Sequence, residues 1–206
     1  RVAAYYHDIC KAVQPYFFIE NQIDRENPHD ELNDPYESAR IVINHVIDGM
    51  ALAHKYRLPK PIADVIAQHH GTMLTAYFYH KAKEQAPNGE VDERFFRYPG
   101  PRPQSREAAI IMLADGAEAT VRATRPTTAD ELENVLKRIF RDRVGSGELD
   151  ESNLQMRDLE LIRRAFFEIL QGQFHPRIQY PTDVREALPE PPRGVWLEGA
   201  TLPAKE

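Results

Sequence analysis

The chain has 206 residues, of which 42% are hydrophobic and 28% are charged, and its formal net charge is −6. This composition is typical of a soluble, single-domain globular protein, and no run approaches the roughly 20 apolar residues that a membrane span needs. The acidic balance argues against polymeric nucleic acid as a partner, because neutralising many phosphates usually takes a basic domain. The single cysteine, Cys10, excludes an intramolecular disulfide and suits a reducing compartment.

The first third of the chain predicts two helices separated by a long loop. Residues 1–8 resemble the second half of an apolar helix with no N-cap ahead of it. Residues 14–34 are rich in proline and asparagine, which predicts a long functional loop. The Asn-Asp-Pro run at 33–35 then supplies an N-cap and a first-turn proline, so we expect a helix over residues 35–56.

The middle third predicts two further helices and a second loop. Pro59 and Pro61 open a helix that ends near Gly71, and its apolar face continues into His69. Another helix is expected over residues 72–83. Residues 86–104 contain too many prolines and glycines for regular structure.

The last third predicts three helices and a tail. Ser105 caps a helix that ends before Pro126, and a capping box at residues 128–131 starts a helix that ends near 145–147. The final helix spans about 154–171, and residues 182–206 form a Pro-rich, poorly periodic tail. With no convincing strand pair, the predicted fold class is all-α, a helical bundle with two long loops.

Six side chains on four predicted helices point to metal chemistry. A helical bundle can direct histidines and carboxylates from separate helices into one interior pocket, as in carboxylate-bridged dinuclear sites. Imidazole and carboxylate suit first-row ions such as iron, manganese, zinc or nickel, and the lack of ligand cysteines argues against a structural zinc cluster. The candidate ligands are His7, Asp8, His45, His69, His70 and Asp115.

Each of these residues also has an ordinary explanation. A single histidine on an apolar helix face is more often a hydrogen-bonded core residue than a ligand. A carboxylate on a buried face is costlier, so Asp115, between Leu113-Ala114 and Gly116-Ala117, is the strongest case, although a salt bridge would satisfy it too.

The ordered motifs resemble a known family. His-Asp at 7–8, His45, His-His-Gly at 69–71 and Leu-Ala-Asp at 113–115 are similar, in order and spacing, to the motifs of HD-domain metal-dependent phosphohydrolases. The flanking loops narrow the likeness to the cytosolic HD domain of PgpH-type seven-transmembrane receptor hydrolases, which degrade cyclic di-AMP. These loop motifs are residues 15–22, 27–30, 68–72 and 97–101. The resemblance predicts an HD domain over residues 1–181.

The resemblance implies a ligand assignment. Asp8 would bridge two divalent transition-metal ions, Fe or Mn; His7 and Asp115 would belong to one ion, and His45, His69 and His70 to the other. In that family a further histidine comes from the helix before the His-Asp pair, upstream of Arg1. We therefore expect an incomplete first metal position if 206 residues are the whole molecule.

One residue departs from the family pattern. Cys10 stands where the family commonly has glycine. Its side chain is expected to crowd the turn beside the metal or the substrate, and a free thiol there could act as a stray ligand.

The resemblance also implies an activity. Two ions would generate hydroxide near neutral pH and hydrolyse cyclic di-AMP to linear pApA. Asp8 and Lys11 are the candidate catalytic residues, with Lys11 and Tyr98 as candidate substrate contacts; a solvated helix-end lysine is the alternative for Lys11. The domain would lie on the cytoplasmic side of a bacterial inner membrane, tethered through segments outside this chain, with a homo-oligomer left open.

Two competing hypotheses remain. The HD-GYP phosphodiesterases, which cleave cyclic di-GMP, have a glutamate after the paired histidines, whereas Gly71 follows here and Tyr98-Pro99-Gly100 has the wrong order. The other alternative is a catalytically weakened or silent sensory module that keeps the HD fold. Metal analysis combined with a hydrolysis assay separates this module from the enzyme.

Overall fold

The structure, a computed structural model, describes residues 1–18 and 27–172. The tail predicted over 182–206 and part of the motif at 15–22 lie outside these residues. The described elements are α1 (Val2–Tyr6), η1 (Ile9–Ala12), η2 (Pro15–Phe17), α2 (Pro28–Leu32), α3 (Pro35–Lys55), α4 (Lys60–Gln68), α5 (Ala76–Gln85), η4 (Glu93–Phe96), α6 (Arg106–Thr124), α7 (Ala129–Gly145) and α8 (Met156–Gln171).

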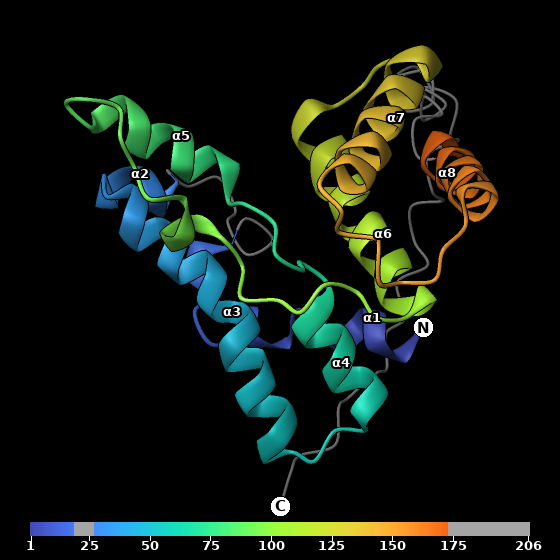
Figure 1. Cartoon of the computed structure of the whole chain (residues 1–206), viewed down its shortest axis with the longest axis horizontal. Helices are drawn as coiled ribbons and strands as arrows, with labels where there is room; N and C mark the ends of the chain where they lie inside the picture. The colour runs from blue at the N-terminus through green and yellow to red at the C-terminus, as the bar shows by residue number, and fades with distance from the viewer. Residues whose placement is uncertain (19–26, 173–206) are drawn as a thin grey trace, which may run out of the picture. The chain divides into compact units, whose positions relative to one another are not determined.

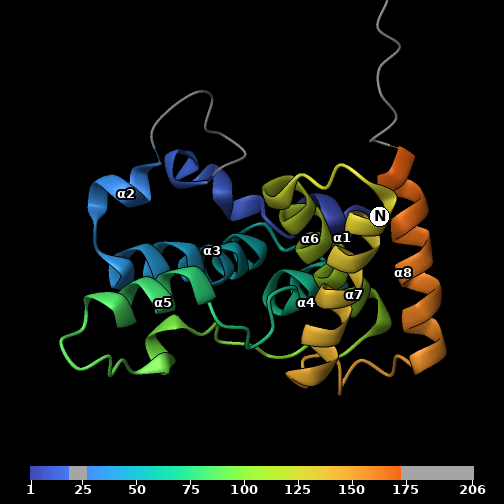
Figure 2. The ribbon, with the colours of Figure 1, turned by 90° about the horizontal axis from the view of Figure 1, so that it is seen from above.

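The helices form two packed groups that α4 connects. Helix α3 packs against α2, α4 and α5, while α6, α7 and α8 pack against one another. Helix α4 contacts both α3 and α6, and α1 lies against α4 (Figure 1). The view from above shows α3 beside α5, and α7 between α6 and α8 (Figure 2). The all-α prediction is confirmed within the described residues, where the only β pairing is a single bridge between Leu74 and Arg97.

Each helix group has its own apolar core. The first joins α3, α5 and η4 through Ile43, Val46 and Phe96. The second lies between α6, α7 and α8, where Met112 and Leu136 are fully buried. Helix α4, which contacts both α3 and α6, therefore lies between the two helix groups.

Helix starts are set largely by the predicted caps. The Asp34 carboxylate accepts hydrogen bonds from the amides of Tyr36 and Glu37 at the start of α3. Ser105 caps α6 by accepting from the Ala108 amide, and Thr128 and Glu131 form the predicted capping box of α7. These side chains satisfy amides that have no partner inside the helix.

The predicted loops contain short helices, which is a correction. In the first loop, the Asn27 side chain caps α2 and Pro28 takes its first position, while Asn33 ends it in a left-handed conformation with φ 47°. In the second loop, the Asp92 side chain caps η4 by accepting from the Arg94 amide. Local caps thus produce single helical turns inside segments that proline and glycine otherwise keep irregular.

The helix predicted over residues 72–83 begins four residues later, at Ala76. The backbone before it pairs with the second loop instead: the Tyr98 amide donates to Met73 O at 2.9 Å and the Thr75 amide donates to Phe96 O at 2.7 Å. Helical propensity at residues 72–75 is therefore overridden by tertiary pairing.

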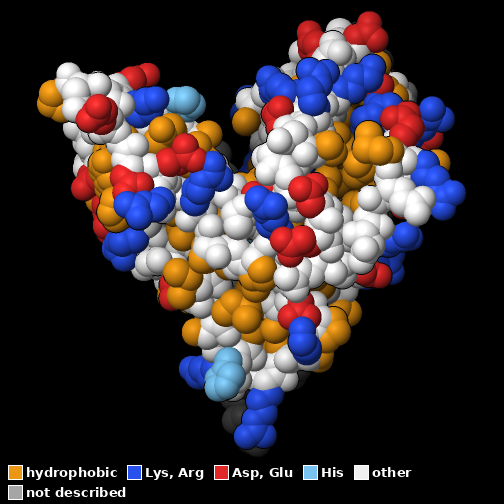
Figure 3. Space-filling view, viewed as in Figure 1, with side chains coloured by type: hydrophobic (Ala, Val, Ile, Leu, Met, Phe, Trp, Pro, Cys, Tyr) orange, Lys and Arg blue, Asp and Glu red, His pale blue; other side chains and the backbone are white. Residues whose placement is uncertain are grey.

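Charge and apolar side chains are mixed on the face drawn in Figure 3. Basic and acidic side chains are interspersed there, and apolar side chains gather between α7 and α8. A cavity of about 430 Å³ in that region is lined by residues that include Val144, Met156 and Leu159. Among the described residues, none of the helices combines the length and apolar character that crossing a membrane requires.

Candidate metal centre

The structure brings all six predicted ligands together at the junction of the two helix groups. They fall into two groups of ligand atoms, each lying within 4.8 Å of one another. We call Asp8, His45, His69 and His70 the three-histidine group, and His7, Asp8 and Asp115 the two-aspartate group. Asp8 belongs to both, as the resemblance implied.

Three of the histidines are oriented by their own helices. The Nδ1 atoms of His7, His45 and His69 face the carbonyl oxygens of Ala4, Val42 and Ile66, each three residues earlier in the chain. A carbonyl oxygen only accepts hydrogen bonds, so these Nδ1 atoms carry the protons. The opposite ring atom, Nε2, is thereby presented to the junction, which is the usual arrangement of a metal-binding histidine.

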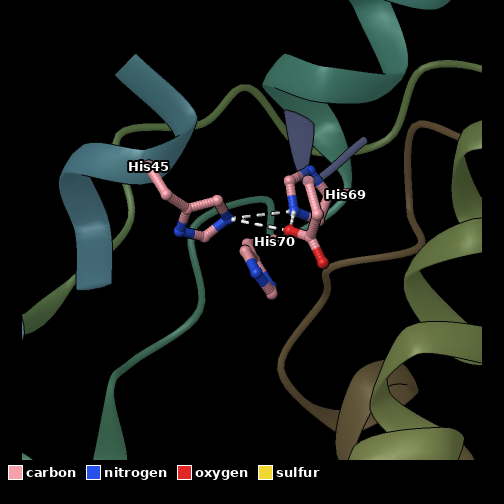
Figure 4. A group of neighbouring side chains, drawn as sticks. His45, His69 and His70 are labelled. Atoms are coloured by element: carbon pink, nitrogen blue, oxygen red, sulfur yellow. Dashed lines mark hydrogen bonds and ion pairs between the residues drawn. The ribbon is translucent and has the colours of Figure 1, made fainter. Parts of the chain in front are cut away.

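Unprotonated ring atoms converge in the three-histidine group. His45 and His69 are 3% and 0% exposed, and their Nε2 atoms lie 3.2 Å apart. Asp8 Oδ1 is 3.4 Å from His45 Nε2 and 3.5 Å from His69 Nε2. Figure 4 shows the His45 and His69 rings facing each other, with His70 beside them. Three acceptor atoms facing one another need a cation between them, either a proton or a metal ion.

The two-aspartate group is arranged around one imidazole. His7 Nε2 lies 3.1 Å from Asp8 Oδ2 and 3.6 Å from Asp115 Oδ1. Asp115 Oδ2 is also 3.9 Å from His70 Nδ1, so this carboxylate approaches both groups. The Asp115 side chain is about one-fifth exposed, so the carboxylate that the sequence placed on a buried helix face is only partly buried.

The charge states of the two groups differ. Burial, together with nearby His69, lowers the pKa of His45 to about 4, and burial with His69 and His45 also lowers that of His70. Burial would lower the pKa of His7 too, but Asp115 and Asp8 outweigh it and raise the pKa to about 10. Burial would raise the pKa of Asp8, yet His69, His7 and the Lys11 ammonium hold it well below its usual range. Asp8 is therefore ionised, and His45 and His70 are neutral, at pH 7.

These residues fit a pair of divalent ions. His7 Nε2, Asp8 Oδ1 and His70 Nδ1 are buried and make no hydrogen bond to any described residue. Ligand atoms bonded to a first-row ion at about 2.1 Å lie about 3 to 3.4 Å apart, close to the separations in the three-histidine group. Ionised Asp8 and neutral His45 and His70 are already in the protonation states that metal binding requires, whereas His7 must lose a proton when an ion binds.

Lys11 and Tyr98, the predicted substrate contacts, both lie at the centre. Lys11 Nζ is 2.8 Å from Asp8 Oδ2 and 5.5 Å from the centre of the Phe18 ring, so it is not the solvated lysine of the alternative. The Tyr98 ring stacks on His70 at 4.3 Å between centroids and 22° between planes. Burial, with Asp115 and Asp8 nearby, raises the pKa of Tyr98, so its hydroxyl stays a hydrogen-bond donor.

Cavities flank Asp115 on two sides. One, of about 290 Å³, is lined by Lys11, Phe17, Phe78 and Tyr98 among others. The second, of about 370 Å³, is lined by His7, Asp8 and Asp115. A ligand in the first cavity would lie beside His45, His70 and Asp115, which also line it.

Two residues of this region were missed from the sequence. Arg122 lines both cavities and lies seven residues after Asp115, two turns along the same helix, a spacing that could have revealed it. The Asn-Pro-His-Asp sequence at residues 27–30 favours an exposed cap or ion pair for His29 over a supporting role beside the ligands. The structure buries His29: its Nε2 donates to Phe17 O at 3.2 Å and its ring packs against Phe78. It supports the aromatic wall of the first cavity.

The position of Cys10 differs from the expectation that its thiol could act as a stray ligand. Its thiol belongs to neither ligand group. The side chain is buried beside α3, where a Cβ on Gly49 would be in ordinary van der Waals contact with Cys10 Cβ at 3.7 Å. Burial and nearby Asp48 raise the pKa of Cys10 to about 11, which leaves a protonated thiol, a poor ligand.

Comparison with known sequences identifies the class. A profile of the HD domain family matches residues 1–120, and the chain belongs to this family. The matched span contains all six candidate ligands.

Individual relatives show which members of the HD domain family this chain is similar to. The chain is 44% identical over 181 residues to the cyclic-di-AMP phosphodiesterase PgpH of Bacillus subtilis and 41% identical over 183 residues to that of Listeria monocytogenes. These matches cover 88% and 89% of the chain but 25% of each relative, so the chain spans about a quarter of the curated relatives it matches. A crystal structure of the L. monocytogenes PgpH HD domain in complex with cyclic-di-AMP has a TM-score of 0.80 and 39% identity, covering 84% of this chain and 79% of that one.

Proposed function

We propose that this chain is a metal-dependent phosphodiesterase domain that hydrolyses cyclic di-AMP to linear pApA. The observation that carries the proposal is the pair of ligand groups sharing ionised Asp8, beside a cavity with an aromatic wall and a lysine. The PgpH relatives, named for this activity, support the choice of substrate.

The ligand sets assign two ions. His45, His69 and His70 would hold one, His7 and Asp115 the other, with Asp8 between them. Imidazole with carboxylate suits first-row ions, and the resemblance to HD-domain phosphohydrolases implies Fe or Mn among them. When bound, two such ions lower the pKa of water and place positive charge next to the phosphodiester.

Lys11 supplies the chain's own positive charge. Its ammonium neighbours Asp8 and lines the first cavity, so it can approach a non-bridging phosphate oxygen or the leaving oxygen. In the hydrolysis, a water oxygen forms a bond to phosphorus as the bond from phosphorus to the 3′ oxygen breaks. One proton of the water is released and the 3′ oxygen gains one, giving a dinucleotide with a 5′ phosphate.

The aromatic wall suits the adenine bases. Phe17, Phe78 and Tyr98 present apolar and π surface to the first cavity, and base stacking on such rings contributes about 1 to 3 kcal/mol per base. Because one face of Tyr98 is stacked on His70, its contribution to substrate binding comes mainly through its edge and its hydroxyl donor.

The proposed substrate also indicates the cellular compartment of the domain. A cyclic dinucleotide messenger and a lone reduced cysteine suit the bacterial cytoplasm. We therefore propose a cytoplasmic domain that belongs to a longer membrane protein.

A single preparation tests the activity. The domain is purified without oxygen in a form extended upstream of Arg1, to include the further histidine that the resemblance implies. Its iron and manganese content is measured, and cyclic di-AMP or cyclic di-GMP is supplied with product separation by chromatography. We expect two ions per chain and conversion of cyclic di-AMP to pApA in preference to cyclic di-GMP cleavage. A chain carrying two ions that leaves cyclic di-AMP intact would instead be the silent sensory module.

A further inference from the structure

Glu148 is a deeply buried carboxylate outside both ligand groups. It lies just after α7 and is 1% exposed. Its Oε1 accepts from the Thr72 hydroxyl at 2.5 Å, and its Oε2 accepts from the Thr72 amide at 2.9 Å. A buried carboxylate is costly unless it is hydrogen-bonded, so this contact across 76 residues of sequence is a specific connection.

The connection holds the turn that follows the paired histidines. Gly71 has a φ of +53°, and a Cβ built on it would lie 2.1 Å from Glu148 Oε2. The carboxylate therefore occupies the space that any other residue at 71 would fill. Within this turn the Met73 amide donates to His70 O at 3.1 Å.

A second anchor lies just before the histidines. The buried Gln68 side chain accepts a hydrogen bond from the Gln104 amide at 3.0 Å. The two-histidine segment is thus held on one side by the second loop and on the other by Glu148.

His70 depends on this support more than its neighbours do. The rings of His45 and His69 are oriented by carbonyls of their own helices, whereas no hydrogen bond is made by His70 Nδ1 to a described residue. In place of such a hydrogen bond, the His70 ring is held by the turn that carries it, by ring contacts with His69 and Tyr98, and by Asp115 at 3.9 Å.

The loop that carries Glu148 also reaches the helix of Asp115. Arg143 O accepts from the Glu148 amide at 3.1 Å, and Arg143 Nη2 lies 3.2 Å from where a Cβ on Gly116 would be. Glu148 is therefore built into the packing between α7 and both segments that bear ligands.

We propose that Glu148 is a positioning residue of the metal centre: by holding the Gly71–Thr72 turn, it fixes the direction of the His70 imidazole. The inference rests on the proposed function, in which His70 is a metal ligand. Changes to groups that orient ligands typically lower metal affinity 10- to 100-fold.

The test uses Co²⁺ as the probe, because its visible spectrum reports the geometry of its ligands. Glu148→Gln keeps the side-chain shape but replaces one acceptor with an amide that cannot accept from Thr72. We expect it to lower Co²⁺ affinity at the three-histidine group about tenfold or more and to change the spectrum. Thr72→Val should show the same direction, and Thr72→Ser, which keeps the hydroxyl, should restore wild-type behaviour.

Two controls separate positioning from general stability. Glu84→Gln removes an exposed carboxylate from α5 and should leave Co²⁺ binding unchanged. Leu136→Ala creates a cavity in the distant α7 core and should lower the melting temperature without changing the spectrum. If Leu136→Ala weakens Co²⁺ binding as much as Glu148→Gln does, or if Glu148→Gln keeps wild-type affinity and spectrum, positioning by Glu148 is wrong.

A metal-free measurement distinguishes this inference from the proposed function. In chains with ¹⁵N-labelled histidine, Glu148→Gln should shift the ring resonances of His70 while those of exposed His54 and His80 stay fixed. A shift in a chain whose wild type takes up no Co²⁺ would support positioning and refute the metal centre. Unchanged His70 resonances would refute positioning even in a chain that binds two ions.

Discussion

The two ligand groups contain the same residue types but differ in the protonation state of their histidines. In the two-aspartate group, His7 lies between two carboxylates and its pKa is raised to about 10, so a proton supplies positive charge there. In the three-histidine group, burial lowers the pKa values of His45 and His70, so their imidazoles are neutral at pH 7. A metal must displace a proton from the first group but enters the second without displacing one from these two rings.

This difference separates the roles of the two positions. The buried, neutral imidazoles favour retention of an ion, while the more exposed, proton-bearing group favours exchange. Asp8 links them, since its Oδ1 faces His45 and His69 while its Oδ2 faces His7 and Lys11.

Removing the shared Asp8 carboxylate should weaken metal binding at both ligand groups. Asp8→Asn keeps the shape of the side chain but removes its charge, and both groups should lose affinity by more than about 100-fold, with hydrolysis lost in parallel. Metal content after dialysis measures this. Asp64→Asn, a partly exposed aspartate on α4, is the matched control, and retention of either ion by Asp8→Asn contradicts the shared role.

Removing one buried imidazole should weaken metal binding at the three-histidine group alone. His45→Leu fills a similar volume, so the metal-free chain should stay folded, but the three-histidine group should no longer be stabilised by metal. Wild type should gain about 2.7 kcal/mol of unfolding free energy at a metal concentration 100 times its dissociation constant. Thermal unfolding with and without Mn²⁺ reads this out; an equal metal-dependent gain in His45→Leu would contradict it.

Metal affinity should depend more steeply on pH at the two-aspartate group than at the three-histidine group. Because the pKa of His7 is raised to about 10, protons compete with metal there, and affinity at the two-aspartate group should fall about tenfold per unit as pH decreases below that value. His45, with a pKa of about 4, adds no such competition near pH 7. Titrations from pH 6 to 9 should therefore empty the two-aspartate group first, whereas loss of both ions together would count against the contrast.

The smallest effect is expected at Cys10. Cys10→Ala removes a buried thiol packed against α3 and should cost about 1 kcal/mol of stability. Metal content and cobalt spectrum should not change, because the thiol is outside both groups. A shifted charge-transfer band from thiolate in the wild-type cobalt spectrum would show that the thiol does bind.

The sequence was enough to predict what is local. Caps at Asp34, Ser105 and Thr128 set helix starts, because each satisfies amides within one turn of itself. The candidate ligands were predicted because His45, His69 and Asp115 lie on apolar helix faces, and because all six residues match the HD-domain motifs in order.

What the sequence did not predict depends on contacts between distant segments. Residues 72–75 pair with the second loop, Cys10 turns toward Gly49, and Glu148 reaches Thr72 across 76 residues. A glutamate in a polar loop carries no periodic pattern, so nothing near Glu148 indicates that it is buried. His29 was likewise misjudged, because its burial comes from Phe17 and Phe78 rather than from its own helix.

The orientation of His45 and His69 by carbonyls three residues earlier has a kinetic consequence. The rings of His45 and His69 are held in their coordinating tautomers by their own chain segments, so an ion arriving at the three-histidine group meets donor atoms there that need not rotate. The rate of capture should then be set by how fast the ion sheds its hydration water, and ions that exchange water quickly should load before those that exchange it slowly.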